Sequence, residues 1–96
     1  MTTQDTVTAA YCRDERVLWR QGYDAVLLLP PGHSQVMSLV GGGTALWELL
    51  SEPHTVEAAA ARLAAMYDTR AEDIAQDIRP VLDELARCGV VRRIEP

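Results

Sequence analysis

Three consecutive glycines, Gly41–Gly43, separate a strand-like segment from a helix-like one in "QVMSLVGGGTALWELL". Glycine-rich turns between a strand and a helix can bind phosphate through backbone N–H groups. A P-loop also needs a lysine after its last glycine, which this turn lacks, and the dinucleotide fingerprint needs a glycine where Leu46 stands. We therefore expect no nucleotide site here. The simpler interpretation is that the glycines let the chain leave an edge strand through backbone angles that other residues disfavour.

Histidine, cysteine and carboxylate side chains are not spaced to form a metal site or a catalytic group. His33 lies in a Pro-Gly turn and His54 in an interhelical loop, and neither has a cysteine or second histidine at ligand spacing. Cys12 and Cys88 lie far apart, and we interpret both as reduced thiols. Most carboxylates fall on the polar faces of predicted helices. We therefore predict no catalytic residue, no metal and no cofactor, and so a protein that is not an enzyme.

The composition is that of one small globular domain. Of the 96 residues, 48% are hydrophobic and 24% are charged, a balance typical of soluble proteins. The net charge of -5 disfavours nucleic acid or an anionic membrane as a partner. The N-terminus lacks the regions of a signal peptide, and no apolar stretch is long enough to span a bilayer. We expect a cytoplasmic protein with a flexible N-terminus at 1–12 and one domain at 13–96.

The hydrophobic pattern predicts three strands followed by three helices, which is an α+β fold. Short apolar runs separated by "QGYD" and "PPGH" predict an antiparallel meander with strands at 16–20, 25–29 and 35–40. After the glycines, the apolar spacing becomes helical and predicts helices at 45–50, 56–67 and 70–88. The tail at 90–95 has the pattern of a short strand fragment.

Capping residues indicate where the helices begin and end. Thr44 and Thr55 are the predicted N-caps of the first two helices. Thr69 and Glu72 have the spacing of a capping box at the start of the third, and Gly89 is placed to end it.

Pro80 falls inside the third predicted helix. An interior proline removes a backbone hydrogen bond and costs about 3 kcal/mol. The helix therefore either kinks at this point or divides into 70–78 and 80–88.

A winged-helix transcriptional regulator is the alternative interpretation of three helices with a small sheet. The recognition helix of such a protein presents basic or amide side chains to DNA. Here the third helix, counted over 70–88, carries three arginines against five acidic residues. DNA binding would have to overcome this negative charge, which makes it the less favoured alternative.

Three segments in a fixed order resemble the PqqD-like family. They are "VLLLPPGHSQVMSLVGGGTALWELL", "HTVEAAAARLAAMYD" and "DIRPVLDELARCGVV". The residues that match the family pattern are Leu39, Leu46, Trp47, Leu49 and Leu50, then Thr55, Val56 and Leu63, then Asp77, Leu82, Leu85, Gly89, Val90 and Val91. The resemblance covers roughly residues 16–95. The chain departs from the pattern at Val40, where asparagine is usual, at Gly41–Gly43 and at Pro80.

This resemblance implies a fold, a function and a site. Members are RiPP recognition elements, which assist enzymes that modify ribosomally made peptides. The implied fold is winged helix-turn-helix-like, with a three-stranded antiparallel sheet followed by three helices. The leader of a precursor peptide adds to the sheet as a fourth strand, between the third strand and the third helix. The strand "QVMSLV" is β-prone and uncharged, as an open edge of this kind requires.

The implied peptide-binding residues lie on these two elements. They are Val36, Met37, Ser38, Leu39 and Val40 on the strand, and Asp73, Ile74, Asp77, Ile78 and Val81 on the helix. The sequence does not fix the strand register, so which strand side chains face the peptide stays open. The implied partners are a precursor peptide and a maturation enzyme such as a leader peptidase or a radical SAM enzyme. A lasso-peptide pathway is the first interpretation.

Overall fold

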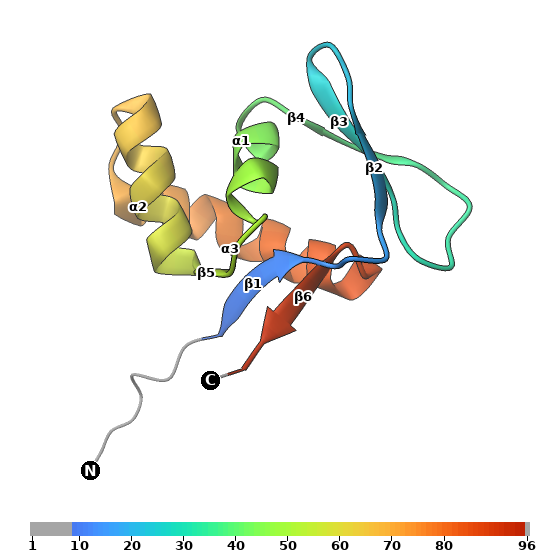
Figure 1. The fold of residues 1–96 in the computed structure, drawn as a ribbon. Helices are drawn as coiled ribbons and strands as arrows, with labels where there is room; N and C mark the ends of the chain where they lie inside the picture. The colour runs from blue at the N-terminus through green and yellow to red at the C-terminus, as the bar shows by residue number, and fades with distance from the viewer. Residues whose placement is uncertain (1–8, 96) are drawn as a thin grey trace.

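The computed structural model describes residues 9–95, which form six strands and three helices (Figure 1). In chain order they are β1 (Ala10–Arg13), β2 (Leu18–Gln21), β3 (Ala25–Leu29), β4 (Met37–Val40), α1 (Gly42–Leu49), β5 (His54–Thr55), α2 (Val56–Tyr67), α3 (Ala71–Cys88) and β6 (Val91–Ile94). The predicted α+β fold, with an antiparallel three-stranded sheet ahead of three helices, is confirmed. The arrangement is compatible with a winged-helix likeness.

The strands β2, β3 and β4 form one antiparallel sheet in that order, which we call the meander sheet. Directly opposed residues of an antiparallel pair share a face. Val26 opposes Leu39 and Leu28 opposes Met37. Val26 and Leu28 are fully buried, and their two partners pack against the same core. This face is therefore the inner one, and β4 begins two residues later than the sequence predicted.

A second antiparallel sheet, in the order β5-β1-β6, was not predicted from the sequence. Its strand β1 pairs with β6 from Ala10 opposite Ile94 to Arg13 opposite Val91. The predicted flexible N-terminus is thus wrong for residues 10–12, because Tyr11 and Cys12 are buried within a strand. Its partner strand lies at the other end of the sequence, so no local pattern marked it. Residues 1–8 lie outside the described part, and the predicted strand in the tail is confirmed as β6.

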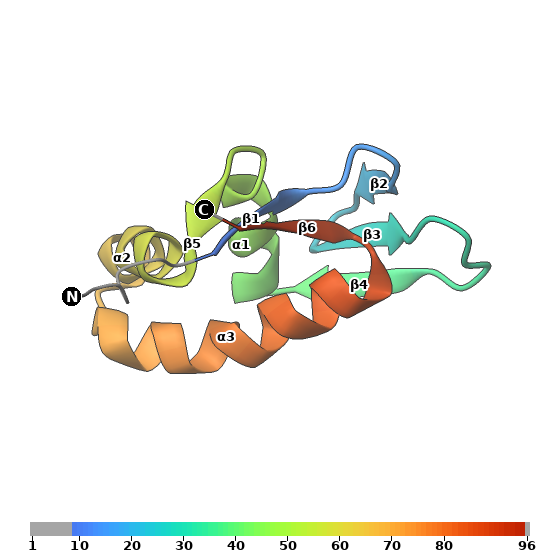
Figure 2. The ribbon, with the colours of Figure 1, turned by 90° about the horizontal axis from the view of Figure 1, so that it is seen from below.

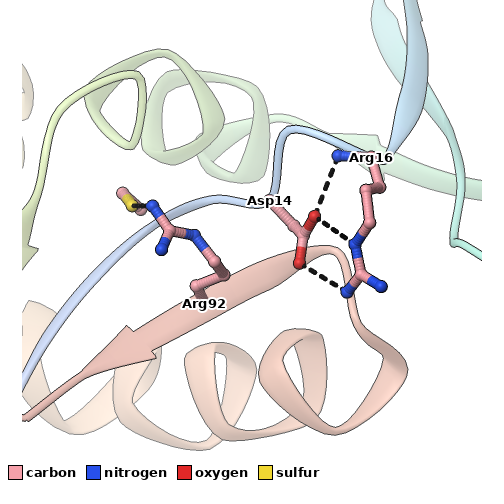
Figure 3. A network of polar contacts seen from close by, with 4 residues as sticks. Asp14, Arg16 and Arg92 are labelled. Carbon is pink, nitrogen blue, oxygen red and sulfur yellow. Dashed lines mark hydrogen bonds and ion pairs between the residues drawn. The ribbon is translucent and has the colours of Figure 1, made fainter.

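Asp14 fixes the corner between β1 and β2 (Figure 3). Its carboxylate accepts bonds from the backbone N–H of Arg16 at 2.8 Å and from the Nε and Nη2 of that side chain at 3.0 and 2.9 Å. These hydrogen bonds lower the pKa of Asp14 to about 2. The backbone N–H of Asp14 donates to the Val90 carbonyl, and Arg92 on β6 donates to the Cys12 sulfur. The corner therefore ties the second sheet to the start of the meander sheet.

The first helix begins earlier than predicted. Gly41 is its N-cap, with a φ of 57° that favours glycine. This turn lets α1 start at Gly42, so Thr44 is not the N-cap; it lies in the first turn, where its hydroxyl and its N–H both donate to the Gly41 carbonyl. The predicted cap of α2 is confirmed, because the Thr55 Oγ1 accepts from the Ala58 N–H at 3.0 Å.

The third helix is one helix from Ala71 to Cys88, so of the two alternatives at Pro80, a kink or a division, the division is wrong. Proline deprives the carbonyl of Gln76 of its usual donor. Both residues are exposed, which leaves that carbonyl open to water. Gly89, with a φ of 86°, ends the helix as predicted.

The predicted capping box at the start of α3 does not form. The Thr69 hydroxyl donates to the Tyr67 carbonyl at 3.1 Å instead of capping the helix. Glu72 pairs with Arg70, which occupies the N-cap position without a side-chain cap bond. The left-handed residue Asp68, with a φ of 54°, turns the chain so tightly that Thr69 faces back towards α2.

The core lies where the helices meet the inner faces of the two sheets. Trp47 of α1 is fully buried and contacts Trp19 of β2 edge to face, with ring centroids 5.8 Å apart. The Arg13 guanidinium lies within 5 Å of both rings, at 4.7 and 4.9 Å, and its Nε donates to the Trp47 carbonyl. In Figure 2 the strands of the meander sheet follow one another as β2, β3 and β4 towards the side on which α3 lies.

Candidate functional site

Within residues 9–95 the strand β4 pairs with β3 alone, so its other edge is free. Its side chains alternate, with Met37 and Leu39 on the inner face and Ser38 and Val40 on the exposed outer face. The structure thus gives the register of β4 against β3, which the sequence did not fix. The edge carries no charged side chain, although proteins usually protect such edges with charges or proline. An extended segment can therefore pair with it through backbone hydrogen bonds.

A groove of about 460 Å³ opens beyond the end of β4. Its walls come from α1, α2, the turn between α2 and α3, and one side of α3. The lining residues are Gly42, Gly43, Leu46, Leu63, Tyr67, Thr69, Ile74, Asp77, Ile78 and Val81. Most of these side chains are apolar, so the groove suits an apolar group from a ligand.

The structure brings together four of the ten predicted site residues in this groove, Ile74, Asp77, Ile78 and Val81. They lie on successive turns of α3, which is why they share one side of the helix. Asp73 is exposed on the same helix but does not line the groove.

The five predicted strand residues lie apart from the groove lining. Met37, Ser38, Leu39 and Val40 make up β4 itself, so they form the free edge. Val36 precedes the strand and is exposed beside a shallow depression of about 200 Å³ that includes Leu18. The edge and the groove are therefore consecutive along the chain, joined by the glycine turn.

Six groove residues were not assigned to the site from the sequence. Leu46 and Leu63 follow helical spacing, which predicts core positions and gives no sign that they also line a groove. Tyr67 follows the same helical spacing but is 51% exposed at the end of α2, and no signal in the sequence marked it as a groove residue. Gly42 and Gly43 were interpreted as part of a turn.

Asp77 is the single charged residue in the groove lining. Other acidic residues on α3 have partners: Glu84 pairs with Arg87 at 3.3 Å, and Asp83 accepts from the Tyr11 hydroxyl at 3.3 Å. Among the described residues Asp77 has no ion-pair partner. The carboxylate is therefore available at the groove to a hydrogen-bond donor of a ligand.

Other classes of site are not built by the described residues. Between residues 9 and 95, no three His, Cys, Asp or Glu side chains gather as metal ligands would. None of the helices in this part of the chain could cross a bilayer. What the arrangement can do is pair with an extended segment along β4 and bury an apolar side chain next to it.

The sequence model of one protein family, described as "Coenzyme PQQ synthesis protein D (PqqD)", matches residues 25–91. The matched region runs from β3 to the first residue of β6. It therefore contains the β4 edge, the glycine turn and every residue that lines the groove. No curated protein and no solved structure matches the chain.

Proposed function

Because the chain belongs to the PqqD family, we propose that it is a non-catalytic module that captures the leader of a ribosomally synthesised precursor peptide. The leader adds as a strand to the free edge of β4, and its apolar side chains enter the groove beside α3. The module then presents the leader to the enzyme that matures the peptide. The observation that carries this proposal is the uncharged, unpaired edge that leads directly to an apolar groove.

The free-energy terms of peptide binding give the edge and the groove different roles. A ladder along β4 contributes about 2–6 kcal/mol from about four backbone hydrogen bonds. Ordering about five peptide residues costs about 5–10 kcal/mol, so the ladder alone does not bind. Two or three buried apolar side chains, at about 1.5–3 kcal/mol each, supply the surplus. The edge accepts any extended peptide, and the groove selects among them.

The proposed second partner is a maturation enzyme that acts in trans, such as a leader peptidase or a radical SAM enzyme. A lasso-peptide pathway is the first candidate. The support comes from the family, whose members serve enzymes that modify ribosomally made peptides. Because such a precursor leaves the ribosome in the cytoplasm, we place the module there.

A DNA-binding regulator is the competing function. In a winged-helix protein, α3 would be the recognition helix and would enter the major groove. Within Ala71–Cys88, however, the acidic residues are Glu72, Asp73, Asp77, Asp83 and Glu84, against Arg79 and Arg87. This charge opposes the approach of a phosphate backbone.

The proposal is tested by a proline in β4. A fluorescent peptide is first selected against the wild-type protein from a displayed library of random short peptides. Ser38→Pro removes a backbone donor or bends the strand, and the Ser38 side chain is exposed, so no core packing is lost. We expect this variant to lose peptide binding by fluorescence polarisation while its far-UV circular dichroism is unchanged.

Ser38→Ala is the matched control, because it keeps the backbone N–H and should bind like the wild type. If Ser38→Pro keeps full affinity, the peptide does not pair with β4 and the proposal is wrong.

A further inference from the structure

The three glycines after β4 differ in whether the fold requires glycine at their positions. Gly41 has a φ of 57°, a backbone conformation that other residues adopt only with strain. At Gly43, an added Cβ would lie 3.4 Å from the Leu39 Cβ, which is an ordinary van der Waals contact with the inner face of β4. At Gly42, φ is not positive and an added Cβ would have no heavy atom within 4 Å. The fold therefore requires glycine at position 41, but neither at position 43 nor at position 42.

Gly42 is also the less favourable choice for the helix that it begins. Glycine loses more backbone freedom than alanine when it enters a helix. Its position in the groove lining offers another reason for its presence. Any side chain at this position would project from the first turn of α1, where the groove opens next to the end of β4.

We infer that Gly42 keeps the groove open for a large apolar anchor side chain, one of the two or three apolar side chains that the bound peptide buries. This inference rests on the proposed function and names the class of peptide that the site takes. The anchor lies past the end of the β4 ladder and not alongside it, because no residue of β4 lines the groove. The occupant is the peptide itself, because β4 ends at Val40, two residues before Gly42 of the groove lining, and a peptide paired along β4 extends past that end.

The distances along the chain define the spacing of the anchor. The ladder ends at Val40, and the groove lining begins at Gly42. This separation is two residues, or about 7 Å of extended chain, so we expect the anchor about two residues outside the paired stretch. The walls formed by Leu46, Ile74 and Ile78 favour Leu or an aromatic residue there.

Two substitutions of Gly42 test this inference, with the peptide selected from the random library as ligand. Gly42→Ala should fold at least as well as the wild type, since the added methyl group meets no protein atom. Gly42→Leu should occupy the groove and weaken peptide binding by about 10- to 100-fold, the value of one buried apolar side chain. Ser34→Leu is the matched control, because it adds the same side chain at an exposed loop position that does not line the groove.

A double-mutant cycle separates a blocked groove from a damaged fold. Replacing the anchor residue of the peptide with alanine should weaken binding to the wild type by about tenfold or more. The same replacement should have little further effect on Gly42→Leu, because the groove is already filled. Peptides reselected against Gly42→Leu should carry a small residue at the anchor position.

The outcomes distinguish this inference from the proposed function. If Gly42→Leu binds the peptide as well as the wild type while Ser38→Pro abolishes binding, the inference about the anchor is wrong. Strand pairing along β4 is then still supported. The inference would also be overturned if replacing the anchor residue of the peptide weakened its binding to the wild type and to Gly42→Leu by the same factor. If the library yields no peptide that binds the wild type, both the inference and the proposed function fail.

Discussion

Replacing Pro80 with alanine should raise the stability of the protein and lower its affinity for the peptide. Pro80 lies inside the continuous helix α3, between the groove residues Ile78 and Val81. Alanine restores the backbone donor for the Gln76 carbonyl and removes the ring that crowds it. Because both Pro80 and Gln76 are exposed, the substitution creates no cavity.

The gain in stability can be estimated from these features. Alanine is about 3 kcal/mol more favourable than proline in a helix interior. The more flexible unfolded chain of the alanine variant offsets about 0.4–1 kcal/mol of this gain. Exposure of the Gln76 carbonyl to water lowers the benefit further, so we expect a net gain of about 2 kcal/mol. For a domain of this size, that gain raises Tm by about 8–16 °C.

The affinity should move in the opposite direction. We expect the proline to bend α3, so that its replacement turns Ile78 and Val81 relative to the rest of the groove. Thermal unfolding and fluorescence polarisation with the selected peptide measure the two effects on the same variant. Gln76→Ala is the control, because this exposed helix substitution leaves Pro80 in place.

Two results would refute this reasoning. Unchanged affinity with higher stability would mean that the shape of α3 at Pro80 has no role in the groove. A lower Tm would mean that Pro80 supports the local fold, contrary to its exposed position in one continuous helix.

Two further predictions concern charge. Because α3 is acidic, the protein should produce no gel shift with duplex DNA at physiological salt, where non-specific binders reach about 10⁻⁴–10⁻⁶ M; a salt-sensitive shift at micromolar protein would favour the regulator. The Arg16 hydrogen bonds lower the pKa of Asp14 to about 2, so this group stabilises the fold above its unfolded pKa, and the contribution disappears as the pH falls through about 4 towards 2. Asp14→Asn should therefore cost about 1–2 kcal/mol at neutral pH and almost nothing near pH 2 in urea unfolding, and a cost that does not depend on pH would contradict this assignment.

Local signals in the sequence were enough to predict the helices and strands whose bounds depend on residues nearby in the chain. The helix α2 begins and ends as predicted, because Thr55 caps it and its buried residues follow a helical period. The strand β3 is also as predicted, since "AVLLL" is bounded by turn residues on both sides. In contrast, β1 depends on pairing with β6 and β5, which come much later in the chain. A short strand held by such distant partners has no signature of its own.

The candidate site could be predicted only in part from the sequence, for a similar reason. The helical period placed Ile74, Ile78 and Val81 on one side of α3, and they do line the groove together. The opposite wall comes from α1 and α2, whose positions depend on how three helices pack. The turn at Gly41 determines where α1 begins, and a threonine N-cap further along gave a plausible but wrong start. Tertiary packing thus decides where the groove lies relative to β4.

Amide hydrogen exchange along β4 tests the central claim most directly. The free edge leaves the outward-pointing N–H groups of Met37–Val40 without a partner strand in the part of the chain that the structure describes. With saturating selected peptide, we expect exchange to slow in this segment and around Gly42, and to stay unchanged in β2, the other edge of the meander sheet. If the peptide protects β2 or another surface and leaves β4 unchanged, strand addition at β4 is not how this protein binds its peptide.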